Sequence, residues 1–422
     1  MANLLEKASI VITPTGYDVG SINAVKTSTS PFADLTFVRG TSATATRVGG
    51  NSFIQTVAQD LPRLDFLGGN NFTIEPPSTN LFLYSEGFNQ TSEWIRIGNA
   101  VGSINATTAP TGTDIGGQIL SDNATSQQGL RETIAVSDAK PYTFSVFAKK
   151  SDYDFICLRF LSTNSAFADK EAYFNISTGA LGTIDSGITA KIENYQNEWF
   201  RCSVTQTSTA AADAQVIIQL ASSDNTTNVV GDGSKKTFIY GAQFEENNFA
   251  TSYIPTSGST VTRDDETATN SGSTSTINST EGVLYAEIKS FENQHGADRV
   301  ISLNDGTNNN RVQIVYLNGQ TNKIGFRIVK ADSDVGSVLE HTVSDVTEFS
   351  KVAARWSSDG FDLFIDGVKR ATNATNPNFS ANTLTQLDLD NGEGAGKFRG
   401  KFRCIAVFKE KISDAALVSL TT

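Results

Sequence analysis

Hydrophobic and polar residues alternate along much of the chain from about residue 80 onward. In the run P-Y-T-F-S-V-F-A, Tyr142, Phe144 and Val146 share one side, while Thr143 and Ser145 take the other. Successive side chains of a β-strand point to opposite faces, so this period predicts a half-buried strand. The same period recurs in three further runs, at Ile156, Leu158 and Phe160, at Val216, Ile218 and Leu220, and at Phe238, Tyr240, Ala242 and Phe244.

Turn formers separate these runs, as in Ser177-Thr178-Gly179 and Gly231-Asp232-Gly233. Short alternating strands joined by such turns are typical of an antiparallel sandwich or jelly roll. We therefore expect one β-sandwich over residues 76–262.

A second β region is expected over residues 281–422. Its alternating runs are Ile324, Phe326 and Ile328, then Val352, Ala354 and Trp356, then Phe361, Leu363 and Ile365. The pair Asp366-Gly367 after the last run predicts a tight hairpin turn. The single convincing helix is terminal, over 412–420, with Ser413 or Asp414 as its cap.

Two stretches fall outside these sandwiches. Residues 1–75 hold brief strand-like pieces such as 34–38, and we expect a small segment that completes itself against a partner and serves attachment or assembly. Residues 263–280 are rich in Ser and Thr and poor in large apolar residues, which predicts a linker or a solvent-exposed crossing.

Composition narrows the function. With 33 Lys and Arg against 45 Asp and Glu, the net charge is -12 and the pI is about 4.8. Such a chain repels phosphate backbones and anionic lipid, so we expect no nucleic-acid partner. The first residues have no basic stretch followed by a long apolar one, and we expect neither an export signal nor membrane insertion.

Cys157, Cys202 and Cys404 are widely spaced, odd in number and each within an apolar run. They are expected to be small buried hydrophobic residues rather than a disulfide framework or a zinc site.

Several phrases resemble a recurring group of bacteriophage virion proteins: F-V-R-G-T-S-A-T-A-T-R-V, L-P-R-L-D-F-L-G-G, E-P-P-S-T-N-L-F-L-Y-S-E-G-F, N-E-W-F-R-C-S-V-T and, above all, residues 238–263. Similar proteins are tail-fibre, head-fibre or minor structural proteins with carbohydrate-binding-module-like jelly rolls. The C-terminal region resembles concanavalin A-like or laminin G-like sandwiches through G-V-L-Y-A-E, W-S-S-D-G-F-D-L-F-I-D-G-V and I-A-V-F-K-E-K-I-S-D-A-A-L.

The resemblance implies an all-β chain of tandem antiparallel sandwiches behind a small N-terminal attachment segment. It implies a homotrimer on the virion surface, assembled in the bacterial cytoplasm, that joins other virion proteins through its N-terminal segment and adheres to host or environmental glycans. The alternatives are a virion polysaccharide depolymerase, a purely structural decoration protein, and a cellular lectin or adhesin.

No catalytic constellation is visible. His295 and His341 lie in polar, loop-like contexts without a nucleophile motif, and we expect surface histidines. Glu245 and Glu246 could be a glycosidase pair, but neighbours on a strand face opposite sides. We therefore expect no catalytic residues and no enzyme.

No cofactor is expected apart from a structural calcium ion. The resemblance implies such an ion between an N-terminal loop and the last strand of the jelly roll. Glu86 and Glu245 match these positions loosely, and a hard cation would take their oxygens.

Sugar binding calls for exposed aromatic rings flanked by amides and carboxylates. Trp94 and Tyr153 have polar neighbours and are the expected contacts, whereas Trp199 and Trp356 sit in apolar strands and are expected in the core.

The run K-F-R-G-K-F-R-C places four cations on one face, namely Lys397, Arg399, Lys401 and Arg403. They could form a stripe for anionic glycans. The favoured interpretation is cross-strand ion pairing with Asp388 and Asp390, which precede a Gly-rich turn.

Overall fold

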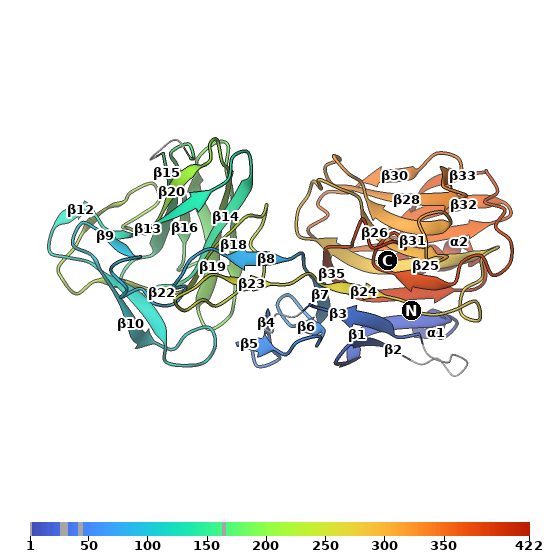
Figure 1. Cartoon of the computed structure of the whole chain (residues 1–422), viewed down its shortest axis with the longest axis horizontal. Helices are drawn as coiled ribbons and strands as arrows, with labels where there is room; N and C mark the ends of the chain where they lie inside the picture. Colours follow the sequence, from blue (N-terminus) through green and yellow to red (C-terminus); the bar gives the residue numbers. More distant parts are fainter. Residues whose placement is uncertain (1, 26–32, 41–44, 163–165) are drawn as a thin grey trace. The chain divides into compact units, whose positions relative to one another are not determined.

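The computed structural model describes residues 2–25, 33–40, 45–162 and 166–422, and it divides into two compact units. Unit 1 contains Met1–Thr41, Gln59–Pro76 and Asp265–Thr422, and unit 2 contains Ser42–Ala58 and Pro77–Asp264. The chain therefore passes four times from one unit to the other. Both units are built from layered antiparallel sheets (Figure 1), so the expectation of tandem antiparallel β-sandwiches is confirmed.

Unit 2 is a sandwich of two six-stranded sheets. The first runs in the order β10 (Val101–Thr107), β11 (Gly116–Leu120), β22 (Lys236–Glu245), β14 (Pro141–Lys149), β19 (Trp199–Thr207) and β18 (Thr189–Asn194). The second runs in the order β17 (Ala180–Ile184), β16 (Lys170–Asn175), β15 (Phe155–Leu161), β20 (Ala212–Ala221), β13 (Gly129–Val136) and β9 (Ile95–Ile97). Three two-stranded ribbons complete the unit: β12 (Thr125–Gln127) with β21 (Asn228–Val230), β8 (Ser78–Asn80) with β23 (Val261–Arg263), and β4 (Ala45–Val48) with β5 (Ile54–Val57).

The core between these sheets is made by the expected alternating positions. Phe144 and Val146 of β14 meet Ile156 and Leu158 of β15 there, and all four are fully buried. Burying aliphatic and aromatic side chains of this size contributes about 1.5–3 kcal/mol each.

One strand departs from the expected alternation. Gly241 has a φ of +57°, and the pairing of β14 with β22 shifts register beside it, which marks a β-bulge. Ala242 then faces the main core, whereas Tyr240 joins a separate aromatic cluster with Trp199 and with Ile54 of the β4–β5 ribbon. The prediction that Tyr240 shares a face with Ala242 is wrong, because the extra residue of a bulge reverses the alternation.

Unit 1 pairs an eleven-stranded sheet with a six-stranded one. The larger runs β24 (Thr267–Thr269), β3 (Leu35–Val38), β2 (Ser21–Ala24), β1 (Ile10–Asp18), β35 (Gly400–Phe408), β25 (Gly282–Ser290), β31 (Ser350–Ser357), β32 (Gly360–Ile365) and β33 (Val368–Asn373), with β7 (Asn71–Ile74) also on β35 and β6 (Arg63–Asp65) on β7. The smaller runs β29 (Ser333–Asp334), β28 (Lys323–Lys330), β27 (Arg311–Tyr316), β26 (Arg299–Asn304) and β34 (Gln386–Asp388), with β30 (Leu339–Thr342) also on β28.

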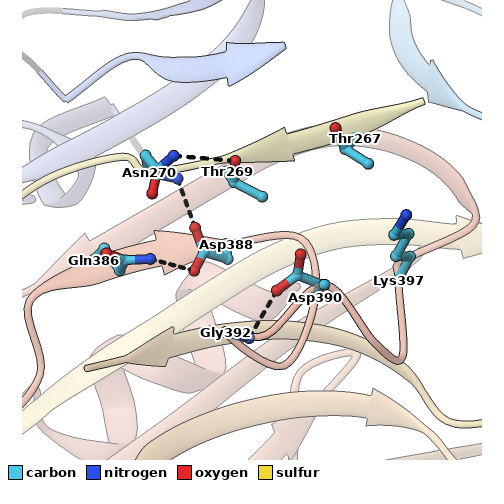
Figure 2. Close-up of a pocket in the computed structure, with 9 residues that line it drawn as sticks. Thr267, Thr269, Asn270, Gln386, Asp388, Asp390, Gly392 and Lys397 are labelled. Atoms are coloured by element: carbon cyan, nitrogen blue, oxygen red, sulfur yellow. Dashed lines mark hydrogen bonds between the residues drawn. The ribbon is translucent and has the colours of Figure 1, made fainter. Parts of the chain in front are cut away.

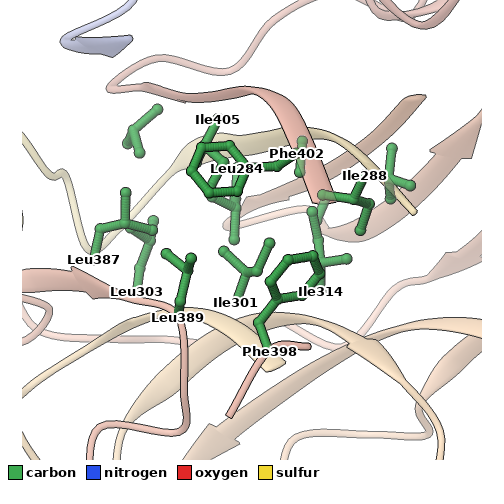
Figure 3. Close-up of a cluster of buried hydrophobic side chains, with 14 of the residues drawn as sticks. Leu284, Ile288, Ile301, Leu303, Ile314, Leu387, Leu389, Phe398, Phe402 and Ile405 are labelled. Atoms are coloured by element: carbon green, nitrogen blue, oxygen red, sulfur yellow. The ribbon is translucent and has the colours of Figure 1, made fainter. Parts of the chain in front are cut away.

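The core of unit 1 lies between these two sheets (Figure 3). Leu284 and Ile405 of the larger sheet pack toward Ile301, Leu303 and Ile314 of the smaller one. The other face of the larger sheet is covered by α2 (Asp414–Thr421), whose Leu417 and Leu420 are buried in a second cluster, and by the short α1 (Ala2–Leu5).

The first 75 residues are mostly built into unit 1. In β1, Val11 pairs with Ala406 of β35, and in β7, Phe72 pairs with Phe402. The boundary expected at residue 75 therefore does not separate a small segment from the C-terminal sandwich, and residues 42–58 belong to unit 2. The role of this segment in attachment stays a prediction.

The expected linker over 263–280 is not a solvent-exposed crossing. Its Thr267–Thr269 is the edge strand β24, and Glu266, Ala268 and Ser271 are buried. Ser271 also exchanges backbone hydrogen bonds with Leu387 of the smaller sheet, so this stretch joins the edges of the two sheets. The prediction was wrong because it inferred exposure from the short polar side chains of this stretch, whereas strand pairing is made by backbone hydrogen bonds.

Three local predictions are confirmed. Asp366 and Gly367 have φ values of +48° and +74°, as a tight hairpin turn requires. Ser413 caps α2 by accepting from the amide of Ala416. All three cysteines are free and buried.

Neither α1 nor α2, the helices of the described ranges, has the length and apolar character needed to cross a bilayer.

Candidate functional site

The outer face of the smaller sheet in unit 1 is polar. Ile301 and Leu303 of β26 point into the core, so Ser302 and Asn304 point outward, and Gln313 of β27 joins them. These three polar residues are at most 1% exposed, because other polar groups and loops surround them. Buried polar side chains persist only when hydrogen-bonded, so this face is an ordered hydrogen-bonding surface.

A loop over residues 390–397 lies against this face. Its ends are fixed by Leu389 and Phe398, which are buried in the core and joined by a backbone hydrogen bond of 2.8 Å. Gly396 accepts from the amide of Val300 at 2.8 Å, and the carbonyl of Asp390 accepts from Ser302 Oγ at 2.6 Å. The 390–397 loop is thus held on β26, and its residues line two hollows.

The first hollow, which we call the acidic hollow, has a volume of about 270 Å³ (Figure 2). It is lined by Thr267, Thr269, Asn270, Gln386, Asp388, Asp390, Gly392, Gly394 and Lys397. The Asp388 carboxylate accepts from the amide of Asn270, from Asn304 Nδ2 at 2.8 Å and from Gln386 Nε2 at 2.7 Å. Uncharged donors on three segments therefore hold this charge in place.

The second carboxylate of the acidic hollow is Asp390, which is 3% exposed. Its Oδ1 accepts from the amide of Gly392 at 2.7 Å. Burial raises the pKa of Asp390 above its ordinary value, and the neighbouring Asp388 adds to this. Lys397 is the single cation among the described lining residues, and its Nζ lies 2.6 Å from Asp265 Oδ2.

The second hollow, which we call the arginine hollow, has a volume of about 320 Å³. It is lined by Gly296, Ala297, Asp298, Val300, Arg311, Gln313, Asn318, Asn391 and Gly396. Arg311 donates through Nε to Gln313 Oε1 at 2.6 Å and through Nη1 to the carbonyl of Asn308. Burial lowers the pKa of Arg311, and the neighbouring Arg327 lowers it further.

Asp298, the acid of this hollow, is paired with Arg327 at 3.2 Å, and Arg327 also reaches Asp334 at 3.1 Å. Among the described residues Arg311 has no carboxylate within ion-pair distance. This guanidinium therefore lines the hollow without an ion-pair partner, although the charges of Asp298, Asp332 and Asp334 act to raise its pKa.

The expected sugar contacts Trp94 and Tyr153 are not presented to solvent. Trp94 is 1% exposed, packs between Phe82 and Phe88 with ring centroids 5.1 and 5.2 Å away, and donates its indole N–H to the carbonyl of Tyr84. Tyr153 is 6% exposed. The prediction of exposed rings is wrong for both residues, because their polar sequence neighbours turn outward while the rings fill the core.

Trp199 and Trp356 are buried, as expected. His341 lies on β30 and is partly exposed, whereas His295 is 3% exposed and stacks on Tyr316 at 5.3 Å. The prediction of a surface histidine is therefore wrong for His295.

Glu86 and Glu245 do not converge on one site. Glu86 Oε1 accepts from the hydroxyls of Tyr240 and Tyr253 at 2.7 Å each. Glu245 is fully buried, and its two oxygens accept from Ser78, Gln243 and Thr251. These donors occupy the oxygens that calcium would take, and in the described ranges no three His, Cys, Asp or Glu side chains gather as a metal site. The two residues do not fit the calcium ion that the resemblance implies.

Glu245 and the exposed Glu246 are also unlike a glycosidase pair. Glu245 is held by the donors named above, whereas Glu246 reaches Tyr142 at 3.3 Å and Lys140 at 3.6 Å.

The four cations of the run 397–403 are paired, but with other acids than expected. Lys397 and Arg399 contact Asp265, Lys401 lies 3.6 Å from Asp65, and Arg403 lies 3.4 Å from Glu287. Ion pairing as such is confirmed. The prediction of Asp388 and Asp390 as the partners is wrong, because the Gly-rich turn folds onto β26 instead of forming a two-stranded hairpin.

Sequence reasoning therefore missed the two hollows. The alternation of Asp388 and Asp390 with Leu387 and Leu389 was visible, and it places both acids opposite the core-facing leucines. Arg311 begins an alternating run in the same way. No pattern in the sequence indicates that residues 267–270, 298–313 and 386–397 meet.

Comparison with known families agrees with the fold of unit 1. Residues 262–417 match the model of the concanavalin A-like lectin/glucanases superfamily. The expected concanavalin A-like character of the C-terminal sandwich is thereby confirmed. No curated protein sequence matches the chain significantly.

Solved structures show only low similarity to the chain. The CBM40 of a Ruminococcus gnavus IT-sialidase, bound to α2,3-sialyllactose, is 16% identical over 36% of this chain and 94% of its own, with a TM-score of 0.29. Domains LG4-5 of the mouse laminin α1 chain are 10% identical over 71% of this chain and 90% of their own, with a TM-score of 0.24. Scores this low carry no inference about a ligand.

Proposed function

We propose that the chain is a non-enzymatic carbohydrate-binding protein of a bacteriophage surface, and that it binds glycans through the two hollows of unit 1. The observation that carries the proposal is the grouping of fixed carboxylate, amide, hydroxyl and guanidinium groups around the 390–397 loop. Sugars offer many hydroxyl donors and acceptors, and sites for them present a few placed polar groups of these kinds. The superfamily match over 262–417 supports a lectin-like role.

The virion part of the proposal rests on the sequence motifs alone. Residues 37–48, 75–88 and 238–263 resemble tail-fibre and head-fibre proteins. On this basis the protein is a homotrimer on the particle surface, contacts other virion proteins through its first 75 residues, and meets bacterial or environmental glycans.

A binding assay tests the proposal. The purified, labelled protein is incubated with bacterial cells and their surface polysaccharides, and the bound fraction is measured together with newly formed reducing sugar ends. We expect saturable binding without sugar release. Q386A, in the acidic hollow, should weaken binding, and the same change on the sheet of unit 2, Q215A, should leave it intact.

Two other results would each overturn part of the proposal. Release of reducing ends would overturn the non-enzymatic assignment in favour of a depolymerase. Absence of binding to every cell and polysaccharide tested would overturn glycan binding and favour an inert decoration protein.

A further inference from the structure

We propose that the two hollows select a zwitterionic glycan, with an ammonium group in the acidic hollow and a carboxylate or similar anion in the arginine hollow. This inference rests on the proposed function and names the substrate class of the same site.

The acidic hollow has negative charge that its own cation does not neutralise. Asp388 is held by three uncharged donors, and Asp390 by a backbone amide. Lys397 is engaged by Asp265, as is Arg399, so neither cation forms an ion pair with Asp388 or Asp390. Carboxylates fixed in this way, in a partly desolvated hollow, attract a cation more strongly than they would in bulk water.

Asp390 is the group that a ligand would contact. In Figure 2, one of its oxygens is turned to Gly392, and the other points toward the strand that carries Thr267 and Thr269. No described side chain donates a hydrogen bond to this carboxylate. The residue is nevertheless only 3% exposed. Burial raises the pKa of Asp390 even though the backbone amides of Gly392 and Gly394 and the charge of Lys397 act to lower it. A ligand ammonium would add a cationic partner to the backbone amides that this carboxylate already accepts from.

In the arginine hollow it is a positive charge, that of Arg311, that lacks an ion-pair partner. Arg311 is oriented by Gln313 and by the carbonyl of Asn308, which fixes its guanidinium without neutralising it. Asp298, the acid of the same hollow, is already paired with Arg327. A guanidinium held in place by neutral groups is suited to a carboxylate, because two parallel N–H groups match its two oxygens.

The hollows are joined by the 390–397 loop, which lines both of them. Their volumes of about 270 and 320 Å³ lie just below and just above the value of about 300 Å³ at which ligand pockets begin. Each is therefore suited to one sugar residue rather than to a long segment. Neighbouring residues of a polymer that carry opposite charges would fit this arrangement.

Four defined probes separate the charges. N-deacetylated hyaluronan oligosaccharides carry a free ammonium and a carboxylate, hyaluronan oligosaccharides carry the carboxylate alone, chitosan oligosaccharides carry the ammonium alone, and dextran carries neither. Titration calorimetry with the full-length protein at low salt measures each affinity. We expect the N-deacetylated hyaluronan to bind about tenfold more tightly than either singly charged probe, as one charge-assisted hydrogen bond allows.

Two variants assign the charges to the hollows. D390N should remove the preference for the free ammonium and keep the preference for the carboxylate, whereas R311Q should do the reverse. Each has a matched control in unit 2: D213N changes an exposed aspartate, and R131Q changes an arginine on β13. Thermal melts establish that all four variants are folded.

The outcomes distinguish this inference from the proposed function. Equal affinity for all four probes, or variants that behave as their controls do, would overturn charge selection while leaving glycan binding in place. Failure to bind these probes by a protein that binds other polysaccharides would also overturn it. Failure to bind any glycan would overturn both.

Discussion

Arg63 and Glu266 form a buried ion pair across 203 residues of sequence, with Arg63 Nε donating to Glu266 Oε1 at 2.8 Å. Both side chains are at most 1% exposed. Glu266 also accepts from Arg39 at 3.2 Å and from the amide of Glu75 at 2.9 Å. This carboxylate thus ties together three separate segments of unit 1.

Removing the charge of Glu266 should destabilise unit 1. E266Q leaves Arg39 and Arg63 with less negative charge around them in a buried place, and we expect the free energy of unfolding to fall by about 3–5 kcal/mol. Denaturant titration with near-UV circular dichroism measures the change. E340Q is the control, because Glu340 pairs with Lys323 at 2.8 Å but is 47% exposed, so its loss should cost less than about 1 kcal/mol. Similar losses for both variants would contradict this account.

The buried Glu132 should make the stability of unit 2 depend on pH. It is 3% exposed, and its Oε2 has no hydrogen-bond partner among the described residues. Burial, with a smaller contribution from Glu93, raises the pKa of Glu132 from 4.5 to about 8. Between these two values the unfolded state ionises and the folded state does not, so folding stability falls as pH rises, by about 1.4 kcal/mol per pH unit.

E132Q removes this effect. We expect the variant to match the wild type near pH 4.5 and to exceed its stability by a few kcal/mol (~1.4 kcal/mol per pH unit) at pH 8. Urea titrations across this range, followed by tryptophan fluorescence, measure the difference. A constant difference between the two proteins at every pH would show that Glu132 titrates normally.

The bulge at Gly241 should not tolerate a side chain. A Cβ there would lie 3.0 Å from Phe147 Cδ2 and from Tyr253 Cε2, at a φ of +57°. We expect G241A to cost about 1–3 kcal/mol of stability. G187A is the matched control, because Gly187 has a φ of +86° but no atom within 4 Å of the added carbon. The additional loss of stability in G241A relative to G187A measures the steric cost of the added carbon. Equal losses in the two variants would contradict the crowding at Gly241.

Changing Trp94 should affect folding and leave glycan binding unchanged. W94F removes the indole N–H that donates to Tyr84 and leaves space between Phe82 and Phe88. We expect a loss of about 1–3 kcal/mol in stability and an unchanged dissociation constant for any glycan that the folded protein binds. A larger dissociation constant in a variant that is as stable as the wild type would show that Trp94 contributes to glycan binding.

The region that matches the superfamily should not fold when it is produced alone. A fragment of residues 262–422 lacks β1 and β7, which pair with opposite ends of β35 in the middle of the larger sheet. The exposed backbone and apolar surface should make the fragment aggregate. Size-exclusion chromatography checks this, and adding residues 1–76 as a separate chain should restore solubility. A monomeric, folded fragment would contradict the expectation.

Local features of the fold could be predicted from the sequence, and long-range ones could not. The core positions Phe144 and Ile156 follow from alternation, and the turn at Asp366 follows from its residue type. Tyr240 was misplaced because a bulge depends on the partner strand as well as on its own glycine. The pairing of β1 with β35 has no local signal, since it is fixed by which edges meet in the folded unit.

The candidate site shows the same limit. Asp388 and Asp390 were singled out by their alternation with leucines, yet their partners come from Asn270 and Asn304, on segments far away in sequence. Trp94 and Tyr153 were chosen from their polar neighbours, and neighbours along the chain do not determine burial in an irregular loop. The sequence indicated which individual residues have side chains suited to binding. It did not indicate which of them come together in the folded unit.

The pairing of β1 with β35 also fixes an order of events during synthesis. Ile10 is made long before its partner Val407, which follows it by 397 residues of sequence (407 − 10). At about 5–20 residues per second, the early strands wait on the ribosome for tens of seconds with their edges unpaired. All of unit 2 emerges within that interval and can fold first, so unit 1 closes only after β35 has been made.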